Sequence, residues 1–237
     1  NTHRLFSRSS ASSRAVPFHK KLDQVMSDPF IPIEFGVNKP GMQASEVLEG
    51  DQLRLATDAW LSARDAAVYR AKKLYELNVH KQIVNRIIEP YMWHTVIVSS
   101  TEWDNFFNQR LSKHGMAQPE MGALADRMYE AIDGSSPKLL LSGQWHLPYI
   151  RAEDNGLSDV DLKKCSMARI ARVSYENHNG VRSLEDDVAL YEKLKSFYHP
   201  APSESIATPD PVGSGNFKGW KQVRWWFEQH KLADLGL

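Results

Sequence analysis

The most informative stretch of this chain is Thr2-His3-Arg4-Leu5-Phe6-Ser7-Arg8-Ser9-Ser10-Ala11-Ser12-Ser13-Arg14. It holds three arginines, one histidine and five serines in thirteen residues, with few apolar side chains to bury. A guanidinium presents a planar fork of N–H donors that matches phosphate or carboxylate oxygens, and serine hydroxyls add single donors. The stretch therefore predicts a site for an anion with several oxygens, although its composition is equally typical of a solvated basic segment.

The overall composition indicates a folded protein whose basic sites are local. Hydrophobic residues make up 42% of the 237 residues, which is enough for a sizeable core. Lys plus Arg and Asp plus Glu both number 29, whereas a general nucleic-acid binder usually carries a basic excess. We therefore predict no nucleic-acid partner, and we expect any basic site to serve a small anion.

Cys165 is the single cysteine of the chain. One thiol builds neither a disulfide framework nor a cysteine-rich zinc site, so we predict no metal and a reducing compartment. The sequence shows no apolar run of membrane-spanning length and no signal peptide. We expect a cytoplasmic protein without a membrane partner, in the host cytoplasm if a virus encodes it. Because the chain starts within a functional-looking motif, we also expect further residues upstream of Asn1.

Hydrophobic periodicity predicts a mostly helical chain with short strands. Runs of β-branched and aromatic residues near Pro or Gly predict strands over residues 29–35 and 93–99. We expect Ser100 or Thr101 to cap the next helix, and Asp104, three residues after Thr101, resembles the second residue of a capping box. The predicted helices cover residues 20–26, 44–77, 80–89, 101–111, 119–134, 159–169 and 184–197. The last of them is expected to turn inward Val188, Leu190, Leu194 and Phe197.

Two interpretations stay open for the C-terminal tail. Trp220, Trp225, Trp226 and Phe227 lie there among lysines and arginines. Aromatic rings beside cations can stack on nucleic-acid bases, but the same mixture is typical of a packed amphipathic segment. The sequence shows no internal repeat and no second domain, so we predict a single domain over residues 1–237.

The order of residues in the opening stretch resembles the signature of the flavin-dependent thymidylate synthases, R-H-R-x-x-S-x-N-E-x-S-x-R. Thr2, Ser9 and Ser10 stand where the family has Arg, Asn and Glu. The positions that match are His3, Arg4, Ser7, Ser12 and Arg14.

A second fragment, Asn105-Phe106-Phe107-Asn108-Gln109-Arg110, is similar to the family's N-F-x-x-L-R segment, with Gln109 in place of Leu. The resemblance implies that Arg110 binds the pyrimidine and promotes ionisation at its N3, and that Asn105 contacts the flavin. A third fragment, Asn85-Arg86-Ile87-Ile88-Glu89-Pro90, resembles A-R-x-x-L-P and assigns Arg86 to the nucleotide.

A fourth resemblance joins two separate pieces of the chain. Residues 168–175 and 199–205 look like R-A-A-R-V-S and H-x-[ST]-P-F-E-H, which implies that Ser174, His199 and Glu204 contact the flavin or folate. In most family members these pieces precede the R-H-R signature, whereas here they follow it. The order is similar to that of a circularly permuted, bacteriophage-like member.

The resemblance implies an α/β (α+β) fold in which long helices pack on a mixed or antiparallel sheet. The implied reaction is reductive methylation of dUMP to dTMP with 5,10-methylenetetrahydrofolate, FAD and NADPH, in a homotetramer whose sites are shared between subunits. Arg110 would be catalytic, because a fixed cation stabilises the negative charge that develops on the uracil ring. The implied nucleotide contacts are Ser10, Ser12, Arg14, Arg86 and Arg110. The implied cofactor contacts are Thr2, His3, Arg4, Asn105, Ser174, His199 and Glu204.

Other activities stay open. If water rather than hydride captures the exocyclic methylene, the product is 5-hydroxymethyl-dUMP or 5-hydroxymethyl-dCMP, and the small residues Ser9, Ser10 and Ser205 could admit that water. A relative that binds nucleotides without turnover is a further possibility. A thiolate mechanism would need Cys165, whose lysine neighbours could lower its pKa; we expect instead a structural cysteine within a helix.

Overall fold

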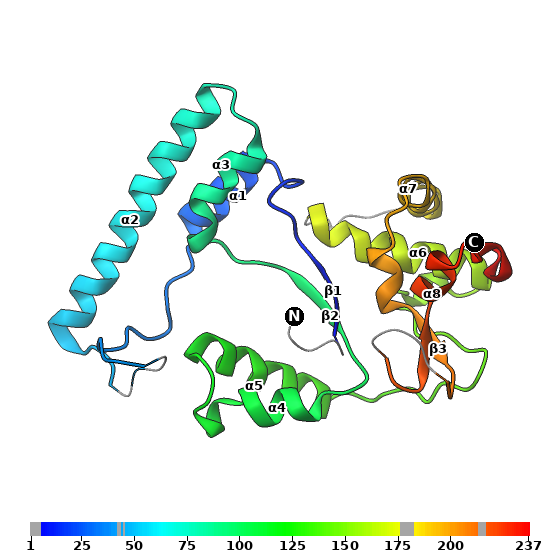
Figure 1. Cartoon of the computed structure of the whole chain (residues 1–237). Helices are drawn as coiled ribbons and strands as arrows, with labels where there is room; N and C mark the ends of the chain where they lie inside the picture. Colours follow the sequence, from blue (N-terminus) through cyan, green and yellow to red (C-terminus); the bar gives the residue numbers. More distant parts are fainter. Residues whose placement is uncertain (1–5, 42–43, 45, 176–182, 213–216) are drawn as a thin grey trace. The chain divides into compact units, whose positions relative to one another are not determined.

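The computed structural model describes residues 6–41, 44, 46–175, 183–212 and 217–237. The fold is α+β, as predicted: the described residues are mainly helical, with two small two-stranded sheets that are both antiparallel (Figure 1). Two compact units make up the chain. The strand unit comprises residues 1–12, 94–102 and 137–237, and the helical unit comprises residues 13–93 and 103–136. The prediction of one domain over residues 1–237 stays a prediction.

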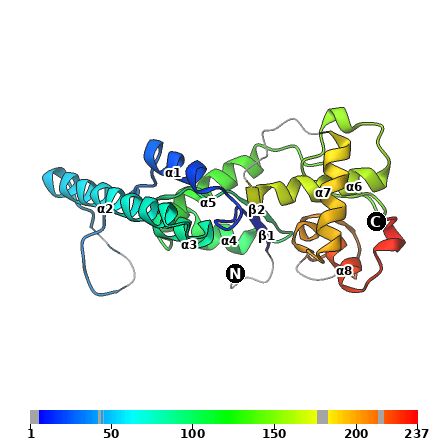
Figure 2. The same cartoon turned by 90° about the horizontal axis from the view of Figure 1, so that it is seen from above.

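The helical unit contains two separate hydrophobic cores. In the first, α1, α2 and α3 lie side by side (Figures 1 and 2), and Val25, Val68, Val84 and Ile88 are buried between them. In the second, Phe107 packs with residues of α4, α5 and the chain between them. The helices are α1 (Phe18–Ser27), α2 (Gly50–Glu76), α3 (Lys81–Ile88), α4 (Asp104–Arg110) and α5 (Pro119–Asp133), with 3₁₀ turns η1 (Glu89–Tyr91) and η2 (Ser112–His114).

The four strands found in the described residues all lie in the strand unit. Strand β1 (Ser7–Ser10) pairs with β2 (Val96–Ser99), with Ser7 opposite Ser99. Strand β3 (Ala207–Pro209) pairs with β4 (Trp220–Gln222). The core of the unit is formed by Met167, Ile170, Tyr191, Ile206, Val223 and Leu237. The helices are α6 (Asp159–Ala171), α7 (Leu184–Ser196) and α8 (Val223–Glu228), with 3₁₀ turns η3 (Ala152–Asp154), η4 (Arg172–Tyr175), η5 (Ala201–Ser205) and η6 (Leu232–Leu235).

Local capping explains where several helices begin. Ser183 starts α7 with a capping box: its hydroxyl accepts the Asp186 N–H at 3.1 Å, and its own N–H bonds the Asp186 carboxylate at 3.2 Å. The Ser158 hydroxyl accepts the Asp161 N–H at the start of α6. Pro119 occupies the first turn of α5, where a missing N–H costs nothing. The helices predicted over 80–89, 119–134, 159–169 and 184–197 are confirmed, with ends within two residues.

The long helix begins later than predicted. Its periodicity suggested a start at residue 44, but α2 starts at Gly50. The preceding backbone is already engaged, because the Val37 N–H donates to the Glu46 carbonyl at 2.9 Å and the Leu48 N–H donates to the Phe35 carbonyl at 2.8 Å. Residues 46–48 therefore run beside residues 35–37 instead of entering the helix.

The predicted strand over residues 29–35 is wrong. Pro29 and Pro32 lack the N–H that a ladder needs, and this segment pairs with its neighbours only at single points. The Phe30 N–H donates to the Tyr91 carbonyl at 2.9 Å, and Gly36 forms an isolated bridge with Val47. The other predicted strand, over residues 93–99, is confirmed in its second half as β2.

Two side-chain predictions are also wrong. The Thr101 hydroxyl does not cap α4; it accepts the Lys218 N–H at 2.9 Å, and α4 begins after Trp103 without a side-chain cap. Phe197, expected to point inward from α7, is 71% exposed, and Tyr191 on the same helix is 2% exposed instead. Tertiary packing selects which apolar residue of α7 is buried, and periodicity alone does not.

Candidate functional site

Strand β1, which carries the signature-like stretch, is the centre of the candidate site. The Ala11 N–H donates to the Thr95 carbonyl at 2.9 Å, which extends the pairing of β1 with the chain before β2. On the other side, the Ser12 N–H donates to the Ser174 carbonyl of η4 at 3.4 Å. Strand β1 also contacts η5, the turn that contains Glu204. The structure thus brings together Ser12, Ser174 and the backbone of Glu204, which are far apart in sequence.

Gln222, the last residue of β4, links β1 to η5. Its side-chain amide donates to the Ser7 hydroxyl at 2.9 Å and to the Glu204 carbonyl at 2.5 Å. Gln222 is 3% exposed and Ser7 is 1% exposed, so the bond between them is shielded from water, whereas the bond to Glu204 is partly buried. Sequence reasoning missed Gln222, because nothing local marks a glutamine near the end of the chain as the partner of Ser7.

The two faces of β1 differ in exposure. Successive side chains of a strand point to opposite faces, and Ser7 is buried whereas Arg8 and Ser10 are exposed. Ser10, predicted to contact the nucleotide, therefore lies on the face that is open to solvent. Ser9 lies on the same face of the strand as Ser7, with its hydroxyl oxygen buried.

Two buried hydroxyls next to this strand have unused hydrogen-bonding capacity. Among the residues that the structure describes, Ser9 Oγ and Ser205 Oγ have no hydrogen-bond partner, and Ser205 is 0% exposed. The same holds for Thr208 Oγ1 in β3. Buried polar atoms are almost always satisfied by protein, water or ligand. These hydroxyls are suited to bonding a polar ligand group or an ordered water.

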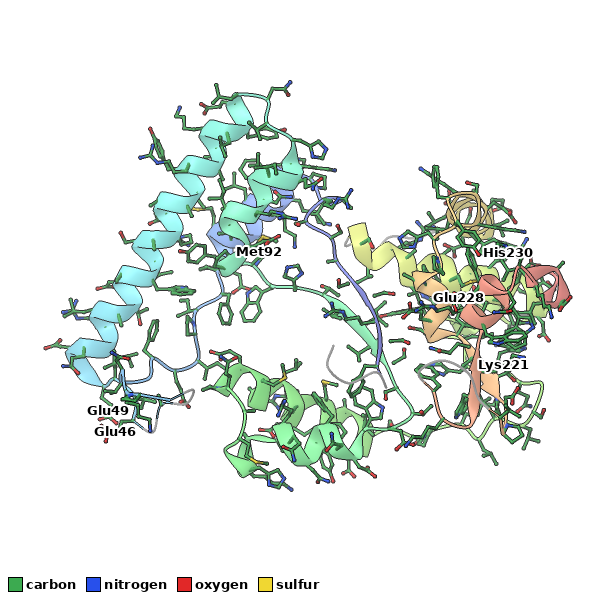
Figure 3. The ribbon with its side chains drawn as sticks, in the orientation of Figure 1. Glu46, Glu49, Met92, Lys221, Glu228 and His230 are labelled. Atoms are coloured by element: carbon green, nitrogen blue, oxygen red, sulfur yellow. The ribbon has the colours of Figure 1, made fainter. Side chains whose placement is uncertain are left out.

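The Glu204 carboxylate is engaged within the protein. Arg224 of α8 donates to it through Nη1 and bonds Glu228 through Nε at 2.6 Å. The hydrogen bond to Glu228 and the charge of Glu204 raise the pKa of the Arg224 guanidinium. Glu228 is labelled beside α8 in Figure 3. Arg224 is a site residue that sequence reasoning missed; only its four-residue spacing from Glu228 could be seen in the sequence.

His199, predicted to contact the cofactor, is exposed and lines a small cavity behind η5. The cavity of about 10 Å³ is also lined by Tyr191, Ser203 and Phe227, and it has room for about one water molecule. The Tyr191 hydroxyl is buried without a partner among the described residues, and burial raises its pKa. The cavity is too small for a flavin or pterin ring, so it offers His199 no cofactor pocket of its own.

The two arginines of the R-A-A-R-like fragment are bound to buried acids. Arg169 bonds Asp154 at 2.5 and 2.8 Å and donates through Nε to Asp187 at 2.8 Å. Arg172 bonds the other Asp187 oxygen through Nη2 at 2.7 Å. The hydrogen bonds from Arg169 lower the pKa of Asp154. Sequence reasoning missed both acids, because their separation of 15 to 18 residues from the arginines carries no local signal.

In the helical unit, the structure joins the turn that carries Arg14 to the helix that carries Arg86. Asn85 of α3 is 0% exposed, and its amide donates to the Ser13 carbonyl at 2.7 Å and to the Val16 carbonyl at 3.1 Å. Lys81 of the same helix adds a bond of 2.7 Å to the Ala15 carbonyl. Both guanidinium-bearing residues are exposed. The backbone positions of the two proposed phosphate ligands are therefore coupled through Asn85.

Arg110 and Asn105 lie on α4. Arg110 is the last residue of this helix, is half-buried, and donates through Nη1 to the Gln109 carbonyl at 3.0 Å. A cation is favoured at a helix C-terminus because the last carbonyls point their negative ends there. Asn105 is exposed near the start of the helix. Both residues belong to the helical unit, as do Arg14 and Arg86.

Three of the predicted cofactor contacts, Thr2, His3 and Arg4, lie outside the described residues. Cys165 is 0% exposed within α6, and burial, with the nearby Asp187 charge, raises its pKa to about 11. The expected position of Cys165 within a helix is confirmed. With this raised pKa the thiol is protonated at neutral pH, which gives no support to a thiolate mechanism.

Two general kinds of site, a membrane-spanning helix and a metal cluster, are not found in the described residues. Of the helices in the described ranges, none has the length and apolar character needed to cross a bilayer. Within the same ranges, His, Cys, Asp and Glu side chains do not gather in threes as a metal site would require.

A scan against protein-family models finds no match, and searches of curated proteins and of solved structures find no significant match either.

Proposed function

We propose that this chain is a flavin-dependent thymidylate synthase that methylates dUMP at C5. One observation carries the proposal: the signature-like stretch and the two family-like fragments at 168–175 and 199–205 meet at β1. The Ser12–Ser174 backbone bond and the Gln222 bonds to Ser7 and Glu204 join these three pieces. A site assembled from several fragments requires such a meeting, whereas unrelated chance matches to the motifs do not.

The buried hydroxyls of Ser9 and Ser205 support a polar ligand beside β1, because they have donors and acceptors to offer there. When bound, reduced FAD would supply the hydride and 5,10-methylenetetrahydrofolate the carbon, with NADPH as the reductant of the flavin. Ser174 would contact the cofactor from η4. Glu204 would contact it from η5, where Arg224 pairs with the Glu204 carboxylate and Gln222 bonds the Glu204 carbonyl. His199 would reach a cofactor only from its exposed side.

For the nucleotide, Arg14 and Arg86 would bind the phosphate from the turn and the helix that Asn85 holds together. Ser10 and Ser12 would add hydroxyl donors. Arg110 would fork across O2 and N3 of the uracil ring and stabilise the anion that makes C5 nucleophilic, since a guanidinium stays protonated. Asn105 would contact the flavin from the same helix as Arg110.

A homotetramer belongs to this proposal. Sites shared between subunits would let residues of one copy complete the site of another. Exposed apolar side chains on α2 and α5 support an assembly, since Leu55 is 58% exposed and Leu124 is 52% exposed. Light scattering of the purified protein gives the mass directly, and a monomer at working concentration would contradict this part.

One alternative has an observation in its favour. Ser9 and Ser205 place small buried hydroxyls where larger family residues are expected, and both can hold water. Water held near an exocyclic methylene would give a 5-hydroxymethyl nucleotide from dUMP or dCMP. A relative without turnover would bind flavin or nucleotide and release no product.

The test combines a spectrum with a product mass. Purified protein is mixed with FAD, freed of unbound flavin, and examined for flavin absorbance and for quenched flavin fluorescence. It is then incubated with dUMP or dCMP, 5,10-methylenetetrahydrofolate and NADPH, and the nucleotide is weighed by mass spectrometry. A methyl product supports the synthase, a hydroxymethyl product supports the alternative, and bound flavin without product supports the non-catalytic relative. Absence of flavin binding would refute the proposal.

A further inference from the structure

We infer that Asp187 is a positioning residue. Through Arg172 it holds η4 in the position in which the Ser174 carbonyl accepts the Ser12 N–H of the signature-like stretch. The ligand named in this inference, FAD, rests on the proposed function. The structural link itself is independent of that function, because every contact in it lies within the strand unit.

Asp187 lies on α7 and is 0% exposed. One carboxylate oxygen accepts Arg172 Nη2 at 2.7 Å and Nε at 3.2 Å, and the other accepts Arg169 Nε at 2.8 Å. The side chains of the two arginines are only 12% and 13% exposed. Charge-assisted bonds at these distances, shielded from water, orient the groups that they join.

The two arginines depend on Asp187 to different degrees. Arg169 has a second carboxylate, because it also bonds Asp154 at 2.5 Å. Among the residues that the structure describes, Asp187 is the one carboxylate paired with Arg172. Loss of the Asp187 charge would therefore leave Arg169 neutralised and Arg172 as a nearly buried cation without its counter-ion, which is costly. The effect should concentrate at Arg172.

Arg172 is the first residue of η4 and follows the end of α6. Its neighbour Val173 is 0% exposed, so η4 is held both by the ion pair of Arg172 and by the buried side chain of Val173. Two residues after Arg172, the Ser174 carbonyl accepts the Ser12 N–H at 3.4 Å. A path of direct contacts therefore runs from Asp187 through Arg172 and η4 to the signature-like stretch.

The adjacent residue of that stretch provides an internal reference. The Ala11 N–H bonds the Thr95 carbonyl beside β2 and does not depend on η4. A change in η4 should expose the Ser12 amide while it leaves the Ala11 amide protected. Global unfolding would expose both amides equally.

The test compares Asp187→Asn with Glu192→Gln. Glu192 lies on the same helix and pairs with Lys164 of α6 at 3.0 Å, but its side chain is 50% exposed. Each change removes one carboxylate that pairs α7 with α6. The Asp187 carboxylate is buried and contacts Arg172 of η4, whereas the Glu192 carboxylate is half-exposed and pairs with Lys164 instead. Amide hydrogen exchange is measured at single-residue resolution, together with FAD and dUMP dissociation constants.

We expect Asp187→Asn to speed exchange of the Ser12 amide by about tenfold relative to Ala11 and to the amides of α8. The FAD dissociation constant should rise on the order of tenfold, as for a typical coupling between linked positions. The dUMP dissociation constant should rise less than that of FAD, because Arg14 and Arg86 lie in the helical unit and only Ser12 links the proposed nucleotide contacts to η4. Glu192→Gln should leave all of these values as in the parent.

If Asp187→Asn does not fold, Arg172→Lys tests the same link from the other side, since lysine keeps the charge and loses the fork that bonds Asp187. Unchanged Ser12 exchange in the variant that folds would overturn the inference, as would equal acceleration at Ser12, Ala11 and α8. If the parent protein binds no FAD, the proposed function fails, and the exchange data still decide whether Asp187 positions η4.

Discussion

The arginines of the two units have opposite surroundings, although both groups lie in family-like fragments. In the strand unit, Arg169 and Arg172 are nearly buried and bonded to Asp154 and Asp187. In the helical unit, Arg86 is exposed, and no carboxylate pairs with it among the residues that the structure describes. A guanidinium whose donors are used by buried acids supports the fold, whereas one that faces solvent can bind a ligand.

This difference follows from the cost of dehydrating charge. Arg169 and Arg172 are shielded, so each requires a carboxylate, and the acids in turn are not available to other cations. Arg86 keeps its hydration, which a phosphate can replace with charge-assisted bonds.

The largest effect is expected for Arg169→Ala. It removes the partner that Asp154 and Asp187 share, which leaves the buried Asp154 carboxylate without its arginine, whereas Asp187 keeps Arg172. Breaking such a pair typically costs about 3–5 kcal/mol in the free energy of unfolding. Urea denaturation followed by circular dichroism measures the loss. The control is Arg127→Ala in the helical unit, whose ion pair with Glu130 is exposed and should matter little; equal losses in both variants would remove the contrast.

A slightly smaller effect, on catalysis instead of folding, is expected for Arg110→Lys. Lysine keeps the positive charge at the end of α4 but loses the planar fork. If Arg110 stabilises the uracil anion, methylation should fall by about 10²–10³, the usual result of removing one such donor. Oxidation of NADPH by the bound flavin should be retained, and Arg127→Lys is the control. Methylation at the parent rate would make Arg110 a helix-terminal residue only.

Arg14→Ala should weaken dUMP binding by about 1.5–3 kcal/mol, as expected for a lost hydrogen bond to a charged group. Deoxyuridine lacks the phosphate, so its affinity should hardly change. Isothermal titration with both ligands gives the difference. Arg54→Ala, which removes an exposed arginine from α2, is the matched control. An equal loss for both ligands would place Arg14 away from the phosphate.

Asp154 should contribute a dependence of stability on acid. Its pKa in the folded protein is lowered, chiefly by the hydrogen bonds from Arg169. The contribution is therefore complete above the pKa of the unfolded chain, about 3.9, and is lost as pH falls through the lower pKa of the folded state. The unfolding free energy should decline as pH falls below the pKa of the unfolded chain, and Asp154→Asn should flatten that decline. A parallel decline in both proteins would assign the effect to other groups.

The smallest effect is expected for Cys165→Ala. The thiol is buried and its raised pKa of about 11 keeps it protonated at neutral pH. Nucleotide turnover should stay close to that of the parent, with a loss of about 1 kcal/mol in stability from the smaller side chain. Turnover and thermal melting are measured on the same preparation. A folded but inactive Cys165→Ala protein would favour a thiolate mechanism over Arg110.

Much of the helical architecture could be predicted because its signals are local. The Ser183 capping box and the Pro119 start mark α7 and α5 within a few residues of sequence. The errors fall where distant chain segments compete. Thr101 bonds Lys218 instead of capping α4, and residues 46–48 pair with residues 35–37 instead of starting α2.

The candidate site shows the same division. Sequence alone determined the abundance of donors in the opening stretch, the choice of Arg14 and Arg86 as candidate phosphate ligands, and the helical setting of Arg110. It could not identify Asn85, Gln222 or Asp187. The partners of Asn85 lie 69 and 72 residues away, those of Gln222 lie 18 and 215 residues away, and those of Asp187 lie 15 and 18 residues away. Periodicity and capping report energies between neighbours in the chain, whereas hydrogen bonds between buried groups depend on which distant segments exclude water together. Only the tertiary structure therefore decided which arginines are bonded to buried acids and which are exposed.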